Sequence, residues 1–232
     1  MPKVYDVPLS KRTFRWLARP VFRGIFHVLS PVTVTGRENV PKRGAYIVVI
    51  NHVSLYDSPF ALAFWPVALE VVGAVDIWQR RGQSSLATWY GGIPVHRGEY
   101  DRQAIQTLLA VLSSGRPLMI APEGGRSHLL GMRRAEPGVG YLVEKACVPV
   151  LPVGITGATD DYLRRALHRE RPPLEMRIGE IITISPEPGQ VASRREDWQH
   201  TTDLIMARLA ALLPVEYQGV YAERPSLASQ AT

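Results

Sequence analysis

Residues 46–57, YIVVINHVSLYD, decide the fold of this 232-residue chain. The run from Tyr46 to Ile50 is apolar without interruption, which predicts a strand buried on both faces of a parallel sheet. A segment that carries Asn51, His52, Ser54 and Asp57 follows at once. Ser58 supplies a helix cap and Pro59 suits the first helical position, so a helix is expected to begin there. The stretch therefore predicts a buried strand, a polar turn and a helix.

The rest of the chain repeats this alternation of strands and helices. Further strands are predicted at residues 32–36, 67–73, 118–121, 148–155, 174–178 and 181–185, the last two as a β pair, and residues 91–97 are predicted to be a loop and a short strand. Helices are predicted at residues 58–65, 100–113, 137–146 and 197–213. Such an alternation is typical of the α/β class, so we predict an αβα sandwich around a mostly parallel mixed sheet.

Composition excludes several classes of protein. With 46% hydrophobic and 21% charged residues, the chain can bury a core and is neither disordered nor a coiled coil. Its single cysteine, Cys147, excludes an intramolecular disulfide framework and a multi-cysteine metal site. No apolar run approaches the roughly 18 residues that span a bilayer. Arg15, Arg19 and Arg23 also interrupt any signal-peptide core, so we expect the protein on the cytoplasmic face of the cell membrane, peripheral or monotopic.

Positive charge is concentrated at the N-terminus. Residues 1–43 hold nine basic and two acidic side chains, whereas the remaining residues are nearly neutral. In a helical projection of residues 11–29, the basic side chains and the apolar stripe fall in separate arcs. Pro20 is expected to divide this segment into two short helices with a kink.

A basic amphipathic segment with aromatic residues is typical of the membrane interface. We therefore expect residues 10–29 to bind an anionic membrane surface, with residues 1–30 as a short amphipathic helical arm. The alternative is a helix pair packed on the domain with its arginines in water. Nucleic acid is not expected as a partner, because no nucleic-acid motif follows. The domain is predicted at residues 31–215, with a flexible tail at 216–232.

A histidine and an aspartate follow the first buried strand. Ligand sites of open α/β sheets lie at this carboxyl edge, and Asp57 could orient His52 as a general base. The spacing alone is weak support, because one such pair arises by chance with odds of roughly one in five. The alternative is a capping aspartate beside an ordinary polar histidine. No Gly-x-Ser-x-Gly nucleophile motif accompanies the pair.

Two later segments carry glycines and cations. The first, residues 91–97, ends in Arg97, and the second, residues 121–127, has a glycine pair followed by Arg126. A glycine pair lets backbone approach an anion, and the arginine fork suits phosphate. The alternatives are a solvated strand end for Arg97, a local salt bridge between Glu123 and Arg126, and a solvated face for the pair 133–134, which could also help to bind an anionic substrate. Metal-site spacing is missing, so no metal is expected.

Taken in order, these segments resemble the glycerolipid acyltransferase superfamily, typified by 1-acylglycerol-3-phosphate O-acyltransferases. The family motifs are Asn-His-x-x-x-x-Asp, Gly-x-Ile/Phe-x-x-x-Arg, Phe-Pro-Glu-Gly-Thr-Arg-Ser and Val-Pro-Val-x-Pro-Val. Here they correspond to box one (residues 51–57), box two (91–97), box three (121–127) and box four (148–153). Ala121 stands where the family has an aromatic residue, Gly125 where it has threonine, and His96 where aspartate is common.

The resemblance implies direct acyl transfer from a thioester to an acceptor hydroxyl, without an acyl-enzyme. His52, held by Asp57, would be the general base. The substrate-binding residues would be Arg97, Glu123, Gly124, Gly125, Arg126 and Ser127. The expected partners are a lysophosphatidic acid-like acceptor and acyl-CoA or acyl-ACP (acyl carrier protein) as co-substrate, with no bound cofactor.

Other readings remain open from the sequence. The acceptor could be another lysolipid, glycerol 3-phosphate or the hydroxyl or amine of a different lipid. The chain could also be a catalytically silent lipid-binding homologue, or a hydrolase that passes the acyl group to water.

Overall fold

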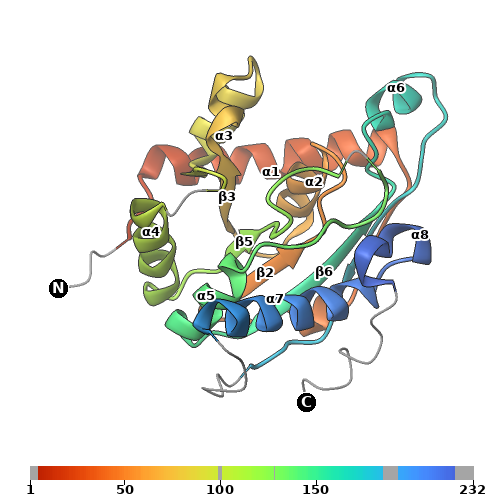
Figure 1. Cartoon of the computed structure of the whole chain (residues 1–232). Helices are drawn as coiled ribbons and strands as arrows, with labels where there is room; N and C mark the ends of the chain where they lie inside the picture. The colour runs from red at the N-terminus through yellow and green to blue at the C-terminus, as the bar shows by residue number, and fades with distance from the viewer. Residues whose placement is uncertain (1–4, 99–100, 128, 185–192, 223–232) are drawn as a thin grey trace.

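The computed structural model describes residues 5–98, 101–127, 129–184 and 193–222. Within these ranges, seven strands form one sheet in the order β1-β7-β6-β2-β5-β3-β4. They are β1 (Val32–Thr35), β2 (Ile47–Ile50), β3 (Glu70–Ala74), β4 (Ile93–Val95), β5 (Leu118–Ile120), β6 (Val150–Thr156) and β7 (Leu174–Ile178). Helices cover both faces of the sheet, so the predicted αβα sandwich is confirmed (Figure 1).

The strand predicted from residues 46–50 lies at the centre of the sheet. β2 runs parallel to β5 on one side and to β6 on the other, with Ile47 opposite Leu118 and Val150. All of its residues are buried, as expected for a strand covered on both faces. Among the described strand pairs, only β6 and β7 run antiparallel, so the sheet is mostly parallel and mixed as predicted.

Each face of β2 contributes to its own hydrophobic core. Val48 and Ile50 pack with side chains of α1 (Leu9–Leu29) and α2 (Asp57–Phe64). Ile47 and Val49 pack with those of α4 (Arg102–Ser113), α5 (Gly138–Ala146) and α7 (Arg194–Ala210). Figure 1 shows these two helical layers on opposite sides of the sheet. The other described helices are α3 (Gln83–Tyr90), α6 (Tyr162–Leu167) and α8 (Val215–Gln218). The 3₁₀ turns are η1 (Arg37–Asn39), η2 (Val75–Gln79) and η3 (Gly219–Tyr221).

Three local predictions are corrected by the structure. Helix α2 begins at Asp57 rather than after a Ser58 cap. The β pair predicted from residues 174–178 and 181–185 is wrong, because β7 already has β1 and β6 on its two sides. Ile182 instead forms an isolated bridge with Val150. The flexible tail predicted from residue 216 is wrong for residues 216–221, which form part of α8 and η3 and bury the side chains of Tyr217 and Tyr221. Residues 223–232 lie outside the described ranges.

The division of this segment into two short helices, predicted from Pro20, is also wrong. α1 is one helix from Leu9 to Leu29 with Pro20 in its interior. Both halves of the helix are held by the domain: Arg15 is buried before the proline, and Phe26 packs in the core after it. These tertiary contacts offset the hydrogen bond that the proline removes.

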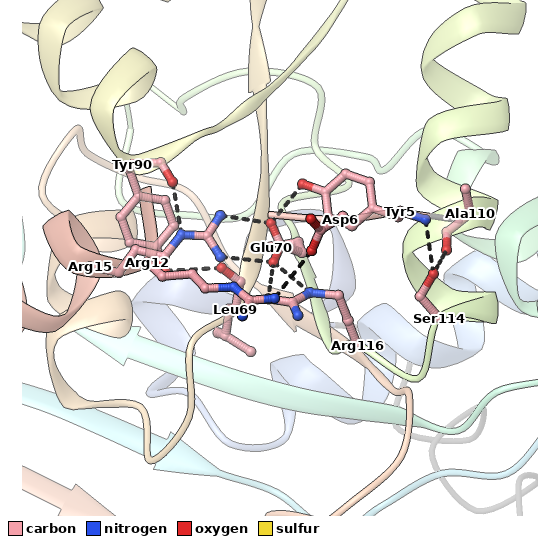
Figure 2. Close-up of polar contacts among 10 residues, drawn as sticks. All are labelled: Tyr5, Asp6, Arg12, Arg15, Leu69, Glu70, Tyr90, Ala110, Ser114 and Arg116. Carbon is pink, nitrogen blue, oxygen red and sulfur yellow. Dashed lines mark hydrogen bonds and ion pairs between the residues drawn. The ribbon is translucent and has the colours of Figure 1, made fainter. Parts of the chain in front are cut away.

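A buried ion-pair cluster joins α1 to the first residue of β3 (Figure 2). Arg15 donates from Nη1 and Nη2 to the two carboxylate oxygens of Glu70, at 2.8 and 2.7 Å. Arg116 donates to the same carboxylate from Nε at 2.9 Å, and the Tyr5 hydroxyl donates at 2.8 Å. Burial raises the pKa of Glu70, but its bonds to Arg15, Tyr5 and Arg116 outweigh this and hold the pKa below its ordinary value.

This cluster determines which face of α1 meets the domain. The arginine side turns inward: only 5% of Arg15 is exposed, and Arg23 Nε donates to the Ala63 carbonyl at 2.6 Å. The alternative of a packed helix pair with its arginines in water is therefore wrong for Arg15. The apolar side turns outward and forms the exposed stripe, which we define as Leu9, Trp16, Leu17, Val21, Ile25 and Val28.

Candidate active site

Box one begins where β2 ends. The Asn51 side chain donates from Nδ2 to the Ile155 carbonyl at 2.9 Å and accepts the Ile155 N–H at 2.8 Å. This paired contact fastens the end of β2 to β6, with Asn51 fully buried. The backbone of His52 therefore leaves the sheet from a fixed point at its carboxyl edge, where ligand sites of such sheets occur.

His52 and Asp57 are brought together as predicted from their spacing. His52 Nδ1 lies 3.1 Å from Asp57 Oδ2, and the same oxygen accepts the N–H groups of Val53 and Ser54 at 2.8 Å each. Asp57 is fully buried. Burial raises its pKa, while the His52 contact and the two backbone bonds oppose that rise. An ionised Asp57 can only accept, so Nδ1 donates to it and Nε2 keeps the free lone pair of a general base.

Glu123 of box three is buried and holds the backbone of the histidine. Its Oε1 accepts the His52 N–H at 2.8 Å, and its Oε2 accepts the Arg133 N–H at 2.7 Å. Burial raises the pKa of Glu123 to about 7 despite these bonds. The structure does not form the local salt bridge between Glu123 and Arg126, because Arg126 pairs with Asp160 instead. Direct contact of Glu123 with substrate stays a prediction.

Ser127, the last residue of box three, also contacts the backbone of His52. Its N–H donates to the His52 carbonyl at 2.9 Å, and its hydroxyl oxygen accepts the Leu129 N–H at 3.3 Å. Only 5% of Ser127 is exposed. Box three therefore holds the backbone of His52 by two hydrogen bonds, with Glu123 at the nitrogen and Ser127 at the carbonyl. The predicted substrate contact of Ser127 is likewise untested by this arrangement.

A cavity of about 750 Å³ opens beside His52. The predicted residues that line it are His52, Arg97, Gly124, Gly125 and Arg126. Arg126 Nη1 lies 2.9 Å from Asp160 Oδ1, and Arg97 Nη1 lies 3.5 Å from Asp76 Oδ2. Gly124 has a φ of 65°, in the left-handed region that favours glycine. The cavity thus places a histidine, a glycine turn and two arginines around one space.

A large section of the remaining cavity wall is apolar. This apolar section comes from α1, α2, β3, η2 and α3, and includes Phe22, Leu62, Val71, Ile77, Trp78 and Leu86. The sequence did not indicate that these residues line a cavity, because apolar residues on short helices and strands are equally typical of a core. Arg133 also lines the cavity, although the sequence favoured a solvated face for it. Among the described residues, no group of three or more His, Cys, Asp or Glu side chains could hold a metal ion.

Comparisons with known proteins agree with this arrangement. The family model described as Acyltransferase matches residues 31–156, which include all four boxes. The 1-acyl-sn-glycerol-3-phosphate acyltransferase alpha of Mus musculus is 27% identical over 178 residues, covering 73% of this chain and 61% of that protein. The Homo sapiens protein of the same name is 26% identical over 139 residues, covering 58% of this chain and 48% of its own length. This chain thus matches less than two thirds of the length of these relatives.

A solved structure has the same fold. The crystal structure of the 1-acyl-sn-glycerophosphate (LPA) acyltransferase PlsC from Thermotoga maritima superposes with a TM-score of 0.60 at 24% identity. The match covers 84% of this chain and 78% of that one. At this identity the likeness concerns the fold, whereas the family model matches more than half of the sequence itself. The chain therefore belongs to the acyltransferase family.

Proposed function

We propose that this acyltransferase transfers an acyl chain from a thioester donor to the hydroxyl of a lysophosphatidic acid-like acceptor. One observation carries the proposal: His52, which Asp57 holds, lines the same cavity as Arg97, Arg126 and the apolar section. The reaction needs a base for the hydroxyl and cations for the phosphate of the acceptor, and an apolar wall for the acyl chain. The names of the curated relatives point to the same substrate class.

The proposed reaction is a direct transfer. His52 Nε2 removes the hydroxyl proton as the oxygen attacks the thioester carbonyl, and Asp57 stabilises the imidazolium that forms. The new C–O bond replaces the C–S bond, and the departing thiolate takes the proton back from His52. The chain has no Gly-x-Ser-x-Gly motif that would favour an acyl-enzyme instead.

The arginines would bind the charged end of the acceptor. Arg97 and Arg126 now face Asp76 and Asp160, and phosphate oxygens would compete with these partly exposed carboxylates. A charge-assisted bond to phosphate contributes roughly 1.5–3 kcal/mol, enough to orient the acceptor. Gly124 and Gly125 would let the phosphate approach the backbone of the loop. Glu123 and Ser127 would act mainly by holding His52 in place.

The proposed donor is acyl-CoA or acyl-ACP, as a co-substrate rather than a bound cofactor. The acyl chain would lie in the apolar section between α1, α2 and α3. Acyl-ACP would add a second protein as partner during the reaction.

Incubation with labelled acyl-CoA or acyl-ACP and a panel of acceptors tests the proposal. The panel contains lysophosphatidic acid, other lysolipids, glycerol 3-phosphate and water alone. We expect label in phosphatidic acid above all other products. Free fatty acid without a new lipid would identify a hydrolase instead, and absence of any turnover would identify a silent lipid-binding homologue.

We further propose that residues 10–29 dock on an anionic membrane surface, at the cytoplasmic face of the cell membrane, as a peripheral or monotopic contact. Within the described residues, no helix has the length and apolar character needed to cross a bilayer. The exposed stripe of α1 supports docking, since Trp16 is 75% and Val28 76% exposed on the side away from the core. Arg12 flanks the stripe and is also exposed, whereas Arg15 is not available to lipid.

Leu17→Glu and Val21→Glu should each lower binding to anionic liposomes about tenfold, because each removes an exposed apolar side chain that the proposed contact would bury in lipid. Sedimentation with vesicles measures this. Point variants are preferable to removal of α1, which would also expose Glu70 and delete Phe26 from the core. Val215→Glu is the matched control, because Val215 is 73% exposed and lies outside the stripe. Equal binding of all variants would contradict docking through α1.

A further inference from the structure

Arg133 follows box three in the sequence, but its guanidinium group reaches back over that box. A Cβ atom built on Gly125 would lie 3.2 Å from Arg133 Nη1 and 3.8 Å from Arg97 Nη1. Both arginines line the same cavity as His52. Two guanidinium groups from distant parts of the chain therefore converge above one backbone position.

The charges around this position are unbalanced. Arg97 has Asp76 as its ion-pair partner and Arg126 has Asp160. Arg133, by contrast, has no carboxylate within ion-pair distance in the part of the chain that the structure describes. Two neighbouring cations of which one has no carboxylate partner favour an anion in the space that they share.

The backbone of Arg133 is tied to the histidine. One carboxylate, that of Glu123, accepts the N–H groups of both His52 and Arg133, at 2.8 and 2.7 Å. Glu123 is only 3% exposed, so its position is set by the surrounding core. The separation between His52 and the start of the Arg133 side chain is therefore fixed. A site that positions both the hydroxyl and the charged group of one ligand requires such a fixed separation.

Gly125 gives Arg133 its room. Its φ is not positive, unlike that of Gly124, so the backbone conformation there does not require glycine. A side chain at this position would meet the Arg133 guanidinium group at 3.2 Å, and Arg133 would have to move. The absence of a side chain at Gly125 thus leaves the space above the loop open for the Arg133 guanidinium group.

We propose that Arg133 is a further acceptor-binding residue, which contacts a dianionic phosphomonoester group above Gly125 together with Arg97. The inference deepens the proposed function and rests on it for the identity of this ligand as the acyl acceptor. Two converging guanidinium groups favour a phosphomonoester over a phosphodiester, which carries one negative charge, and over a neutral lipid.

Binding of a short-chain lysophosphatidic acid, below its critical micelle concentration, tests this role by calorimetric titration. Arg133→Gln should raise the dissociation constant about tenfold or more, the loss of a charge-assisted bond. It should not change binding of the monoacylglycerol with the same chain. Arg134→Gln is the matched control, because Arg134 is adjacent and exposed but does not line the cavity. Equal constants for the two variants, or equal losses for both ligands, would overturn the proposal.

Gly125→Thr provides a second, independent measurement. It should weaken phosphomonoester binding in the wild-type background and have little further effect beside Arg133→Gln, since both changes remove the same contact. Additive losses would overturn the role assigned to Gly125.

Acyl transfer is measured in parallel, so that the two proposals can fail separately. Arg133-dependent binding without any acyl transfer would support the anion site and overturn the proposed function. Acyl transfer to lysophosphatidic acid with a KM that Arg133→Gln leaves unchanged would support the function and overturn the anion site.

Discussion

Replacing His52 by alanine is expected to lower acyl-transfer turnover by about 10²–10⁴-fold, the contribution of a general base. The imidazole is the titratable group held by Asp57 at 3.1 Å, and it lines the cavity that the arginines also line. Without it, the acceptor hydroxyl would have to lose its proton to water. The rate of phosphatidic acid formation from a labelled acyl thioester, at saturating acceptor, measures the loss.

The chain contains a matched control for this variant. His96 and Asp101 have the same spacing as His52 and Asp57, and His96 Nδ1 lies 2.8 Å from Asp101 Oδ2. The His96 side chain is 57% exposed, however, and it is not among the residues that line the cavity. His96→Ala should therefore leave turnover unchanged. Undiminished turnover in His52→Ala, or an equal loss in both variants, would remove His52 from the mechanism.

Replacing Glu70 by alanine is expected to lower the free energy of unfolding by about 3–5 kcal/mol, the effect of breaking a buried ion pair. Arg15 would keep its charge in a site where only 5% of the residue is exposed. Arg116 and Tyr5 would lose the same acceptor (Figure 2). Urea denaturation measures the change, and Arg15→Ala should give a loss of similar size.

Glu175→Ala is the control for this prediction. Glu175 pairs with Arg177 at 2.9 Å, but both side chains are well exposed to solvent. Exposed pairs contribute at most about 1 kcal/mol, so this variant should remain close to the wild type. A Glu70→Ala variant as stable as Glu175→Ala would show that the buried cluster does not hold α1 on the sheet.

The same cluster predicts a pH dependence. Because the folded-state pKa of Glu70 lies below its ordinary value of 4.5, the stability from its ionised form is present above that pH. It is lost as the pH falls through the lower, folded-state pKa. Glu70→Gln cannot ionise, so its stability should fall less steeply than that of the wild type below pH 4.5. Parallel pH profiles for the two proteins would contradict this expectation.

The fold could be predicted because its signals are local. A continuous apolar run such as residues 47–50 is typical of a central strand, and its neighbours in the sequence supply the turn and the helix. The late β pair was predicted wrongly for a related reason. Alternation along residues 174–178 indicates a strand, but not which strands will lie beside it, and β7 pairs with β1 and β6.

The candidate site was only partly predictable. The spacing of His52 and Asp57 is shared by His96 and Asp101, so spacing could not distinguish a buried pair in a cavity from an exposed one. The structure places Arg97 and Arg126 at the cavity, but the anion-binding pattern in the sequence did not indicate their partners Asp76 and Asp160. Those contacts join residues from separate segments of the chain, and no local pattern encodes them.

By itself, the sequence determined the α/β class, the central strand and the order of the four boxes, because these depend on side-chain periodicity and on contiguous motifs. The tertiary structure decided which side of α1 turns inward, which backbone N–H groups Glu123 accepts and which arginines lie above Gly125. The physical reason is that the free energy of a charge depends on its burial and its partners. Arg15 is interior only because Glu70, from another element, lies opposite it.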